Sequence, residues 1–300
     1  MKKTLLILLV ILLLPVVVFG VINRNDDYSS EKALWKLNKE YHEVAKDPKA
    51  APQASFDGLI AKYDKFVKKY NTSKIIPIAR IYSGRVYAVS GDYKTARKVF
   101  EEVIGENPNN MIMISMAYKH IIQTFAAEED FVNVVKTYEQ IKNNYPLTEL
   151  GIRAPLDIAR LYAVRKEELR KIAAVKAALS YYNDLLKRDM HPLAKMMIMR
   201  FQSECYFALG MWKEGVDTLK DMLIGFPETE YLSVARARWI ISTINAMSAG
   251  RLKNYDRPVE IYSEFIQKYP EHPYRQVFEQ VIVKMKEAKA QNSAEAAQQK

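Results

Sequence analysis

The chain has one cysteine and four histidines among its 300 residues. One cysteine excludes an internal disulfide, a zinc site built on two or more thiolates, and a CxxC redox pair. The two histidines nearest in sequence, His120 and His191, are 71 residues apart. The sequence also lacks a glycine-rich phosphate loop and the GxSxG, HExxH and DxDxDG motifs. We therefore expect no enzyme activity, no cofactor, no metal and no small-molecule substrate.

The composition is that of a globular protein, with 49% apolar and 27% charged residues, which excludes the disordered, collagenous and coiled-coil classes for the whole chain. The net charge is +10, and residues 151–200 contain 11 basic and 5 acidic side chains. Such basicity concerns the choice of partner and says nothing about the fold. Because the charge is patchy and no nucleic-acid reader motif is present, we expect protein partners and no nucleic acid.

An unbroken apolar run covers residues 5–22, after Lys2 and Lys3. Its length as a helix, about 27 Å, barely matches the hydrocarbon core of a bilayer. Residues 1–22 are therefore either a signal peptide cut after Gly20, or an uncleaved anchor that spans the inner membrane through residues 4–22. Both alternatives predict an extracytoplasmic protein, periplasmic or in the cell envelope, that is secreted or anchored. The run has no cysteine, so there is no lipobox.

Bulky or apolar residues recur at offsets 0, 3, 7 and 10, followed by proline at offset 15. Offsets 3, 7 and 10 lie on one face of a helix, and the proline stops that helix. The complete pattern begins at Tyr93, Phe131, Trp212 and Tyr255, and a version without the proline begins at Phe56 and Val175. The sequence therefore predicts six similar units.

A second helix precedes each of these helices. An apolar or small residue recurs eight positions after each offset-15 position and indicates this second helix. Short turns such as Ser90-Gly91-Asp92 and Leu209-Gly210 separate it from the helix that follows. Glycine supplies the left-handed conformation that a helix end needs. Each unit thus reads as a leading helix, a turn, a trailing helix and a stop.

Two units resemble the tetratricopeptide repeat family, in which small residues let paired helices touch and aromatic residues fill the gap. The matching residues are Gly84, Tyr87, Gly91, Tyr93, Ala96, Phe100 and Pro108, and then Tyr206, Gly210, Trp212, Gly215 and Pro227. The resemblance covers about residues 30–285, although the units are longer than the family's 34 residues. It implies an all-α, right-handed α-solenoid of about six helical hairpins that binds protein segments along its leading helices.

A looser resemblance concerns the junctions between units. Tyr145-Pro146-Leu147-Thr148 and Phe226-Pro227-Glu228-Thr229 are similar to junctions of periplasmic repeat proteins, such as the outer-membrane-assembly lipoprotein component and the Tol-Pal coordinator. The lipidated cysteine of the assembly component is absent here. This resemblance implies an assembly or adaptor role in the envelope.

The repeat domain is expected to cover residues 28–289. Its first helix is predicted over Ser29–Lys46, capped by Ser30, with a connecting loop at residues 47–55. A last helix at residues 274–289 is suited to cap the stack. Residues 290–300 have too few apolar side chains to pack, so we expect a disordered tail.

Two units carry extra residues between their paired helices. Tyr87 precedes Tyr93 by six residues, whereas Tyr162 precedes Val175 by thirteen and Thr243 precedes Tyr255 by twelve. Insertions at one place in a solenoid project from one edge. We hypothesise a basic edge that meets an acidic protein or anionic head groups; the alternative is a solvated extension balanced by Glu167 and Glu168. The candidate edge residues are Arg165, Lys166, Arg170, Lys171, Arg251 and Lys253.

The favoured function is an exported scaffold that binds other proteins through the wall formed by its leading helices. The candidate groove residues are Arg80, Arg85, Lys119, Arg153, Arg160, Arg200, Arg236 and Arg238. A self-associating structural protein of the envelope is one alternative. A hydrolase with a cryptic site is another, but Cys205 is expected to be a small buried hydrophobe, because no base is placed near it.

Overall fold

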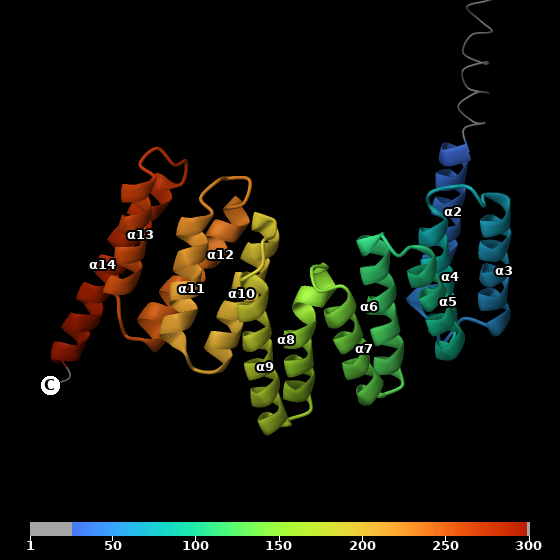
Figure 1. Ribbon diagram of the computed structural model, residues 1–300, viewed down its shortest axis with the longest axis horizontal. Helices are drawn as coiled ribbons and strands as arrows, with labels where there is room; N and C mark the ends of the chain where they lie inside the picture. Colours follow the sequence, from blue (N-terminus) through green and yellow to red (C-terminus); the bar gives the residue numbers. More distant parts are fainter. Residues whose placement is uncertain (1–25, 299–300) are drawn as a thin grey trace, which may run out of the picture. The chain divides into compact units, whose positions relative to one another are not determined.

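The computed structural model describes residues 26–298, and every regular element in this range is helical (Figure 1). This confirms the all-α prediction. The elements are α2 (Asp26–Lys46), α3 (Gln53–Lys69), α4 (Ile76–Val89), α5 (Tyr93–Glu106), α6 (Met111–Ala127), α7 (Phe131–Asn144), α8 (Glu149–Val164), α9 (Glu168–Leu186), α10 (Pro192–Ala208), α11 (Trp212–Gly225), α12 (Val234–Asn245), the π-helix η1 (Ala246–Arg251), α13 (Asp256–Lys268) and α14 (Arg275–Gln298).

The apolar run of residues 5–22 lies outside the described residues. Within residues 26–298, no helix is long and apolar enough to cross a membrane.

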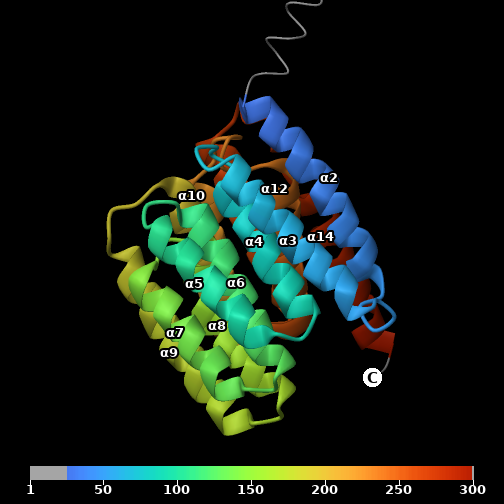
Figure 2. The same ribbon diagram turned by 90° about the vertical axis from the view of Figure 1, so that its right-hand side faces the viewer.

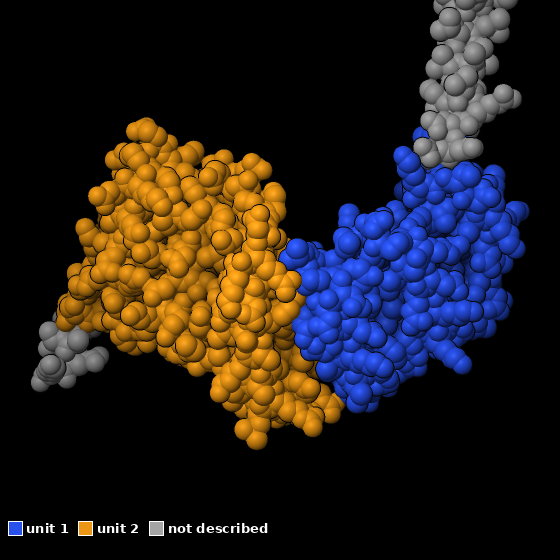
Figure 3. All heavy atoms as spheres, in the orientation of Figure 1, with its two compact units in different colours: residues 1–150 blue, residues 151–300 orange. Residues whose placement is uncertain are grey.

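The chain divides into two compact units, with the boundary in the sequence between Leu150 and Gly151 (Figure 3). Unit 1 holds the hairpins α2/α3, α4/α5 and α6/α7. Unit 2 holds α8/α9, α10/α11 and α12–η1/α13, with α14 packed on α13. Within each unit the trailing helix of one hairpin packs on the leading helix of the next, as α3 does on α4 and α11 on α12. These six sequential hairpins confirm the predicted tetratricopeptide-like fold class.

The trailing helices begin and end close to the predicted positions. In α5, Ala96, Phe100 and Val103 are fully buried, as their shared face predicts. The Asp92 side chain accepts a hydrogen bond from the Thr95 amide at 3.0 Å and caps the helix. Asp130 caps α7 in the same way, so local capping and the apolar stripe together define these helices.

Three trailing helices carry a fully buried tyrosine at offset 7: Tyr63, Tyr182 and Tyr262. Each hydroxyl donates a hydrogen bond to the leading helix of its own hairpin. Tyr182 donates to the Ile152 carbonyl at 2.9 Å, and Tyr63 donates to Asn38 Oδ1 at 2.8 Å. Tyr262 donates to Asn245 Oδ1 at 2.8 Å. Because a buried hydroxyl needs a partner, these bonds favour one register of the paired helices.

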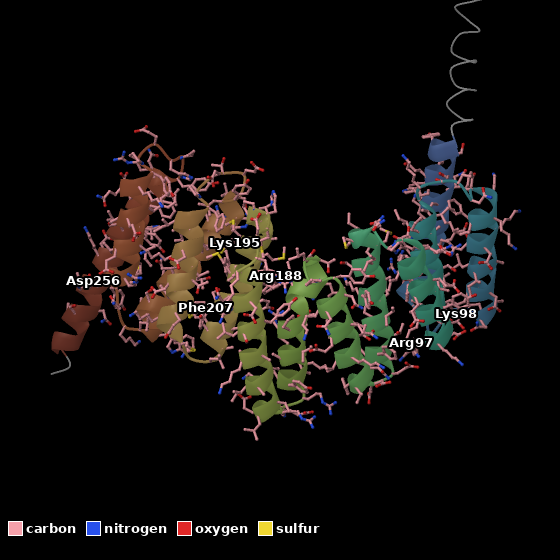
Figure 4. All side chains as sticks on the ribbon, viewed as in Figure 1. Arg97, Lys98, Arg188, Lys195, Phe207 and Asp256 are labelled. Atoms are coloured by element: carbon pink, nitrogen blue, oxygen red, sulfur yellow. The ribbon has the colours of Figure 1, made fainter. Side chains whose placement is uncertain are left out.

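Phe100 closes the α4/α5 hairpin against Gly84. A Cβ atom added at Gly84 would come within 2.5 Å of the Phe100 ring. Gly215 of α11 meets the ring of Phe207 in the same way; Figure 4 labels Phe207 on α10. The small residues therefore let the helices touch, as the resemblance implies.

The turn inside a hairpin uses a left-handed residue whether or not glycine is present. Gly91 and Gly210 have φ of 90° and 75°, as expected. Glu129, Lys166 and Lys253 take φ of 56°, 59° and 55° in other hairpins. Packing of the paired helices therefore outweighs the intrinsic cost of this conformation, which is of order 1 kcal/mol for a residue with a side chain.

Three details differ from the sequence-based predictions. Ser30 does not cap α2, because the helix begins at Asp26; its hydroxyl is instead buried 2.9 Å from the Ser73 hydroxyl. The first connecting loop is shorter than expected, since α3 begins at Gln53. Helix α14 continues to Gln298, through residues expected to be a tail, because alanine, glutamine, glutamate and lysine are strong helix formers.

The two insertions do not project as loops. The first is absorbed by α9, which begins at Glu168 and is 19 residues long. The second continues α12 as η1. One insertion therefore lengthens a trailing helix and the other a leading helix.

We predict that Gly84→Ala lowers the free energy of unfolding by about 1–3 kcal/mol, because the new methyl group overlaps the Phe100 ring. Gly58→Ala is the matched control, since nothing lies within 4 Å of its added Cβ. That helical substitution should stabilise the protein by about 0.5–1 kcal/mol. Urea unfolding measures both, and equal effects of the two variants would contradict the predicted contact.

We also predict that stability falls at alkaline pH. Burial raises the pKa of Tyr63, Tyr182 and Tyr262 above the usual value of 10. Their stabilising contribution is complete below about pH 10 and decreases above it, because tyrosines of the unfolded chain ionise first. Urea unfolding on either side of this pH tests the prediction, and Tyr182→Phe should make the decrease shallower. A free energy of unfolding that is constant across this range would contradict it.

Candidate functional site

The leading helices of unit 2 carry a connected row of side chains. Arginines and carboxylates recur at spacings of three and four residues on α8 and α10, which places them on one face of each helix. Helix α12 adds an aromatic ring. The members of this row, which we call the unit 2 wall, are Arg153, Asp157, Arg160, Arg200, Glu204 and Trp239.

Asp157 joins the two arginines of α8. Its Oδ2 atom accepts a hydrogen bond from Arg153 Nε at 2.8 Å, and its Oδ1 atom accepts one from Arg160 Nη1 at 2.9 Å. The Asp157 side chain is only 8% exposed. A carboxylate buried to this degree needs such charge-assisted bonds, so Asp157 holds both guanidinium groups in place.

Arg160 and Arg200 link the three leading helices of unit 2. Arg160 Nη2 donates to Glu204 Oε2 at 2.8 Å and so connects α8 with α10. Arg200 Nε donates to Glu204 Oε1 at 3.3 Å. The guanidinium carbon of Arg200 lies 5.0 Å from the centre of the Trp239 ring on α12, within the range of a cation–π contact.

The outermost charges of the unit 2 wall are positive. The side chains of Arg153, Arg160 and Arg200 are 44–52% exposed, whereas that of Glu204 is 27% exposed and that of Asp157 is nearly buried. The carboxylates therefore lie behind the guanidinium groups. An approaching partner meets donors held in fixed orientation, an arrangement that suits carboxylate or phosphate groups.

The other predicted groove residues do not join this row by any described contact. Arg80 pairs with Glu106 of α5 at 2.6 Å. Arg85 lies over the rings of Tyr41 and Tyr82, at 4.9 and 4.8 Å. Both belong to unit 1, as does Lys119, which is exposed on α6. The prediction thus combined residues of two separate units.

Arg236 and Arg238 both lie on α12. Arg238 is exposed. Arg236 is partly buried, and its Nη1 atom is enclosed without a hydrogen-bond partner among the described residues. A buried guanidinium nitrogen without an acceptor is costly, and no described contact joins Arg236 or Arg238 to the unit 2 wall.

The predicted basic edge is largely balanced by its own acidic residues. Arg165 and Arg170 both pair with Glu167, at 2.5 and 2.9 Å, and the hydrogen bond from Arg165 lowers the pKa of Glu167. Lys171 pairs with Glu168 at 2.8 Å. These contacts favour the solvated extension that the sequence left as an alternative.

The remaining edge residues belong to the turns beside the inserted segments. Lys166 and Lys253 are left-handed turn residues. Arg251 lies over the Trp212 ring at 5.1 Å. No described contact joins the 165–171 segment to Arg251 or Lys253.

Cys205 lies in the core of unit 2, packed with residues such as Tyr182, Ile198 and Phe201. It is fully buried, and burial raises the pKa of its thiol to about 12. Within the described part of the chain, no group of three or more His, Cys, Asp or Glu side chains is placed to hold a metal ion.

Sequence reasoning missed Asp157, Glu204 and Trp239, although part of the signal was present. Arg153, Asp157 and Arg160 have spacings of four and three, and Glu204 follows Arg200 by four residues, which predicts ion pairs on one helix. The contacts between helices depend on how the hairpins stack. A sequence alone does not supply that geometry.

The hairpins and the contacts between successive leading helices define a tetratricopeptide-like helical-repeat fold. Residues 79–110 match the tetratricopeptide repeat family model. The search of curated proteins gave no match. Among solved structures, the chain is similar to the TPR2AB domain of yeast Sti1 in its pHSP90 complex, with 15% identity and a TM-score of 0.29, covering 84% of this chain and 98% of that one.

We predict that the thiol of native Cys205 does not react with iodoacetamide at neutral pH. Its raised pKa keeps it protonated, and the thiolate is the reactive form. Mass spectrometry should detect alkylation only after unfolding in urea. Rapid labelling of the folded protein would contradict the buried position.

Proposed function

We propose that this chain is a protein-binding scaffold, and that the unit 2 wall binds an acidic segment of a partner protein. The observation that carries the proposal is the row of three exposed guanidinium groups in front of two recessed carboxylates. The row is held rigid by contacts within and between α8, α10 and α12. A preorganised row of donors loses little side-chain entropy when it binds.

The shape of the row favours a polymer over a small ligand. Its charges lie on α8 and α10 and its aromatic ring lies on α12, and the Arg160–Glu204 and Arg200–Trp239 contacts join these three helices. An extended or helical peptide can contact such a row at several points, with arginine and tryptophan as the side chains that most often dominate interface energy. We expect the bound peptide to be acidic because the outermost charges of the unit 2 wall are positive.

We further propose that the scaffold acts in the cell envelope, in an assembly or adaptor role. The apolar run of residues 5–22 supports export, because both alternative interpretations of it place the rest of the chain outside the cytoplasm. The aromatic-proline junctions support the assembly role by their resemblance to periplasmic repeat proteins.

The test begins with affinity capture of partners from solubilised envelopes and identification of the bound segment. We then predict that Arg153→Glu/Arg200→Glu weakens binding of that purified segment roughly tenfold, because two attractive charge contacts become repulsive. This variant keeps Arg160, and with it the link between α8 and α10. Titration at low and high salt measures the effect, which should shrink as salt screens the charges.

The matched control is Arg188→Glu/Lys213→Glu, which changes the net charge equally at two exposed positions of unit 2 outside the wall. It should leave the affinity unchanged. A second comparison reverses Arg165, Lys166, Arg170 and Lys171 to glutamate. Loss of binding in that variant, with full binding in the wall variant, would assign the partner to the basic edge and contradict the proposal.

A further inference from the structure

Helix α2 carries an exposed stripe in which aromatic and lysine side chains alternate. Tyr28 and Trp35 are 45% and 57% exposed. The Nζ atom of Lys32 lies 5.9 Å from the centre of the Tyr28 ring, and that of Lys39 lies 3.7 Å from the centre of the Trp35 ring. We call Tyr28, Lys32, Trp35 and Lys39 the α2 stripe.

The stripe faces away from the core of unit 1. Its members are four, three and four residues apart and so share one side of the helix. Leu34, Leu37 and Tyr41 occupy the other side and are buried. Figure 2 looks onto α2 and α3, which no other helix of unit 1 covers there. Burial in the fold therefore does not explain the exposed tryptophan.

Helix α2 carries five acidic and four lysine side chains, and lysine predominates only along the groove between α2 and α3. Glu40 and Glu43 are engaged by Lys62 and Lys46, whereas Glu31 and the first-turn residues Asp26 and Asp27 are the other acidic residues of the helix. Within residues 26–298, Lys32, Lys36 and Lys39 form no ion pair. This shallow groove of about 230 Å³ between α2 and α3 carries the basic surface, with Lys36, Lys62, Lys65 and Lys69 against a single acidic residue, Glu40.

The position of α2 in the chain points to the occupant. The apolar run ends at Ile22, and only Asn23, Arg24 and Asn25 separate it from Asp26. Three residues span at most about 10 Å. If the run inserts in a membrane, the first turn of α2 stays close to the membrane surface.

We propose that the face formed by the α2 stripe and the α2–α3 groove lies against an anionic phospholipid surface when residues 5–22 span the bilayer. Tryptophan and tyrosine favour the membrane interface, and lysine stems lie along apolar surface while their ammonium groups reach the phosphates. Each lysine near such a surface contributes about fivefold to membrane affinity. This inference rests on the proposed envelope location and is independent of the unit 2 wall.

Trp35 provides the reporter for the test. The full-length chain carries three tryptophans, and Trp212→Phe/Trp239→Phe leaves Trp35 as the only one. This protein is reconstituted in vesicles of equal parts phosphatidylcholine and phosphatidylglycerol, with and without brominated acyl chains. We expect blue-shifted Trp35 emission and severalfold stronger quenching by the brominated lipid.

Charge reversal separates the lipid contact from general exposure. Lys32→Glu/Lys39→Glu should remove most of the quenching, and so should vesicles of phosphatidylcholine alone. The matched control is Lys94→Glu/Lys98→Glu on α5, two exposed lysines of the same unit, of which Figure 4 labels Lys98. In this control, the brominated lipid should quench Trp35 emission as strongly as in the parent protein. Circular dichroism confirms that each variant is folded.

A second reporter distinguishes a flat α2 from an upright one. Tyr28→Trp in a variant that also carries Trp35→Phe moves the single tryptophan to the first turns of the helix. Quenching at position 28 with none at position 35 indicates a helix that stands away from the bilayer and contradicts the proposal. An unquenched Trp35 whose emission shifts only when a protein partner is added also contradicts it. Either result leaves the scaffold function intact.

Discussion

The structure depends on the closure of the helical hairpins, which in four of the six described hairpins is made by a ring of the trailing helix packed against its own leading helix. Phe100 does this through direct contact with Gly84, and Tyr63, Tyr182 and Tyr262 do it with a buried ring and a hydrogen bond to the leading helix. The apolar ring supplies most of the burial energy, and the hydroxyl adds specificity of register. Four of the six hairpins in the described residues share this contact, two in each unit.

Closure of the hairpins leaves the leading helices side by side, and that adjacency creates the unit 2 wall. Its arginines reach from one leading helix to the next only because α8, α10 and α12 are neighbours. Surface ion pairs of this kind add little stability by themselves. Their greater effect is to hold guanidinium groups in place, which converts a feature of the fold into a surface with a defined charge.

The trailing helices could be predicted from sequence because their signal is local: an apolar stripe, a capping aspartate such as Asp92, and a proline stop. The left-handed Glu129 and Lys166 could not, because hairpin packing imposes that conformation against local preference. The two insertions could be located in the sequence, but the helices they form could not be predicted. Their incorporation into α9 and η1 depends on contacts between helices. In the candidate site, the arginines were found individually. Asp157 was missed because its burial depends on the stacking of the hairpins.

Site-specific photocrosslinking to the captured partner tests the central claim most directly, that leading helices form the binding surface. A photoreactive residue replaces Arg153 on α8 in one protein and the exposed Lys176 on α9 in another. The account predicts crosslinks to an acidic segment of the partner from position 153 and none from position 176. Crosslinks from the trailing-helix position alone would contradict it.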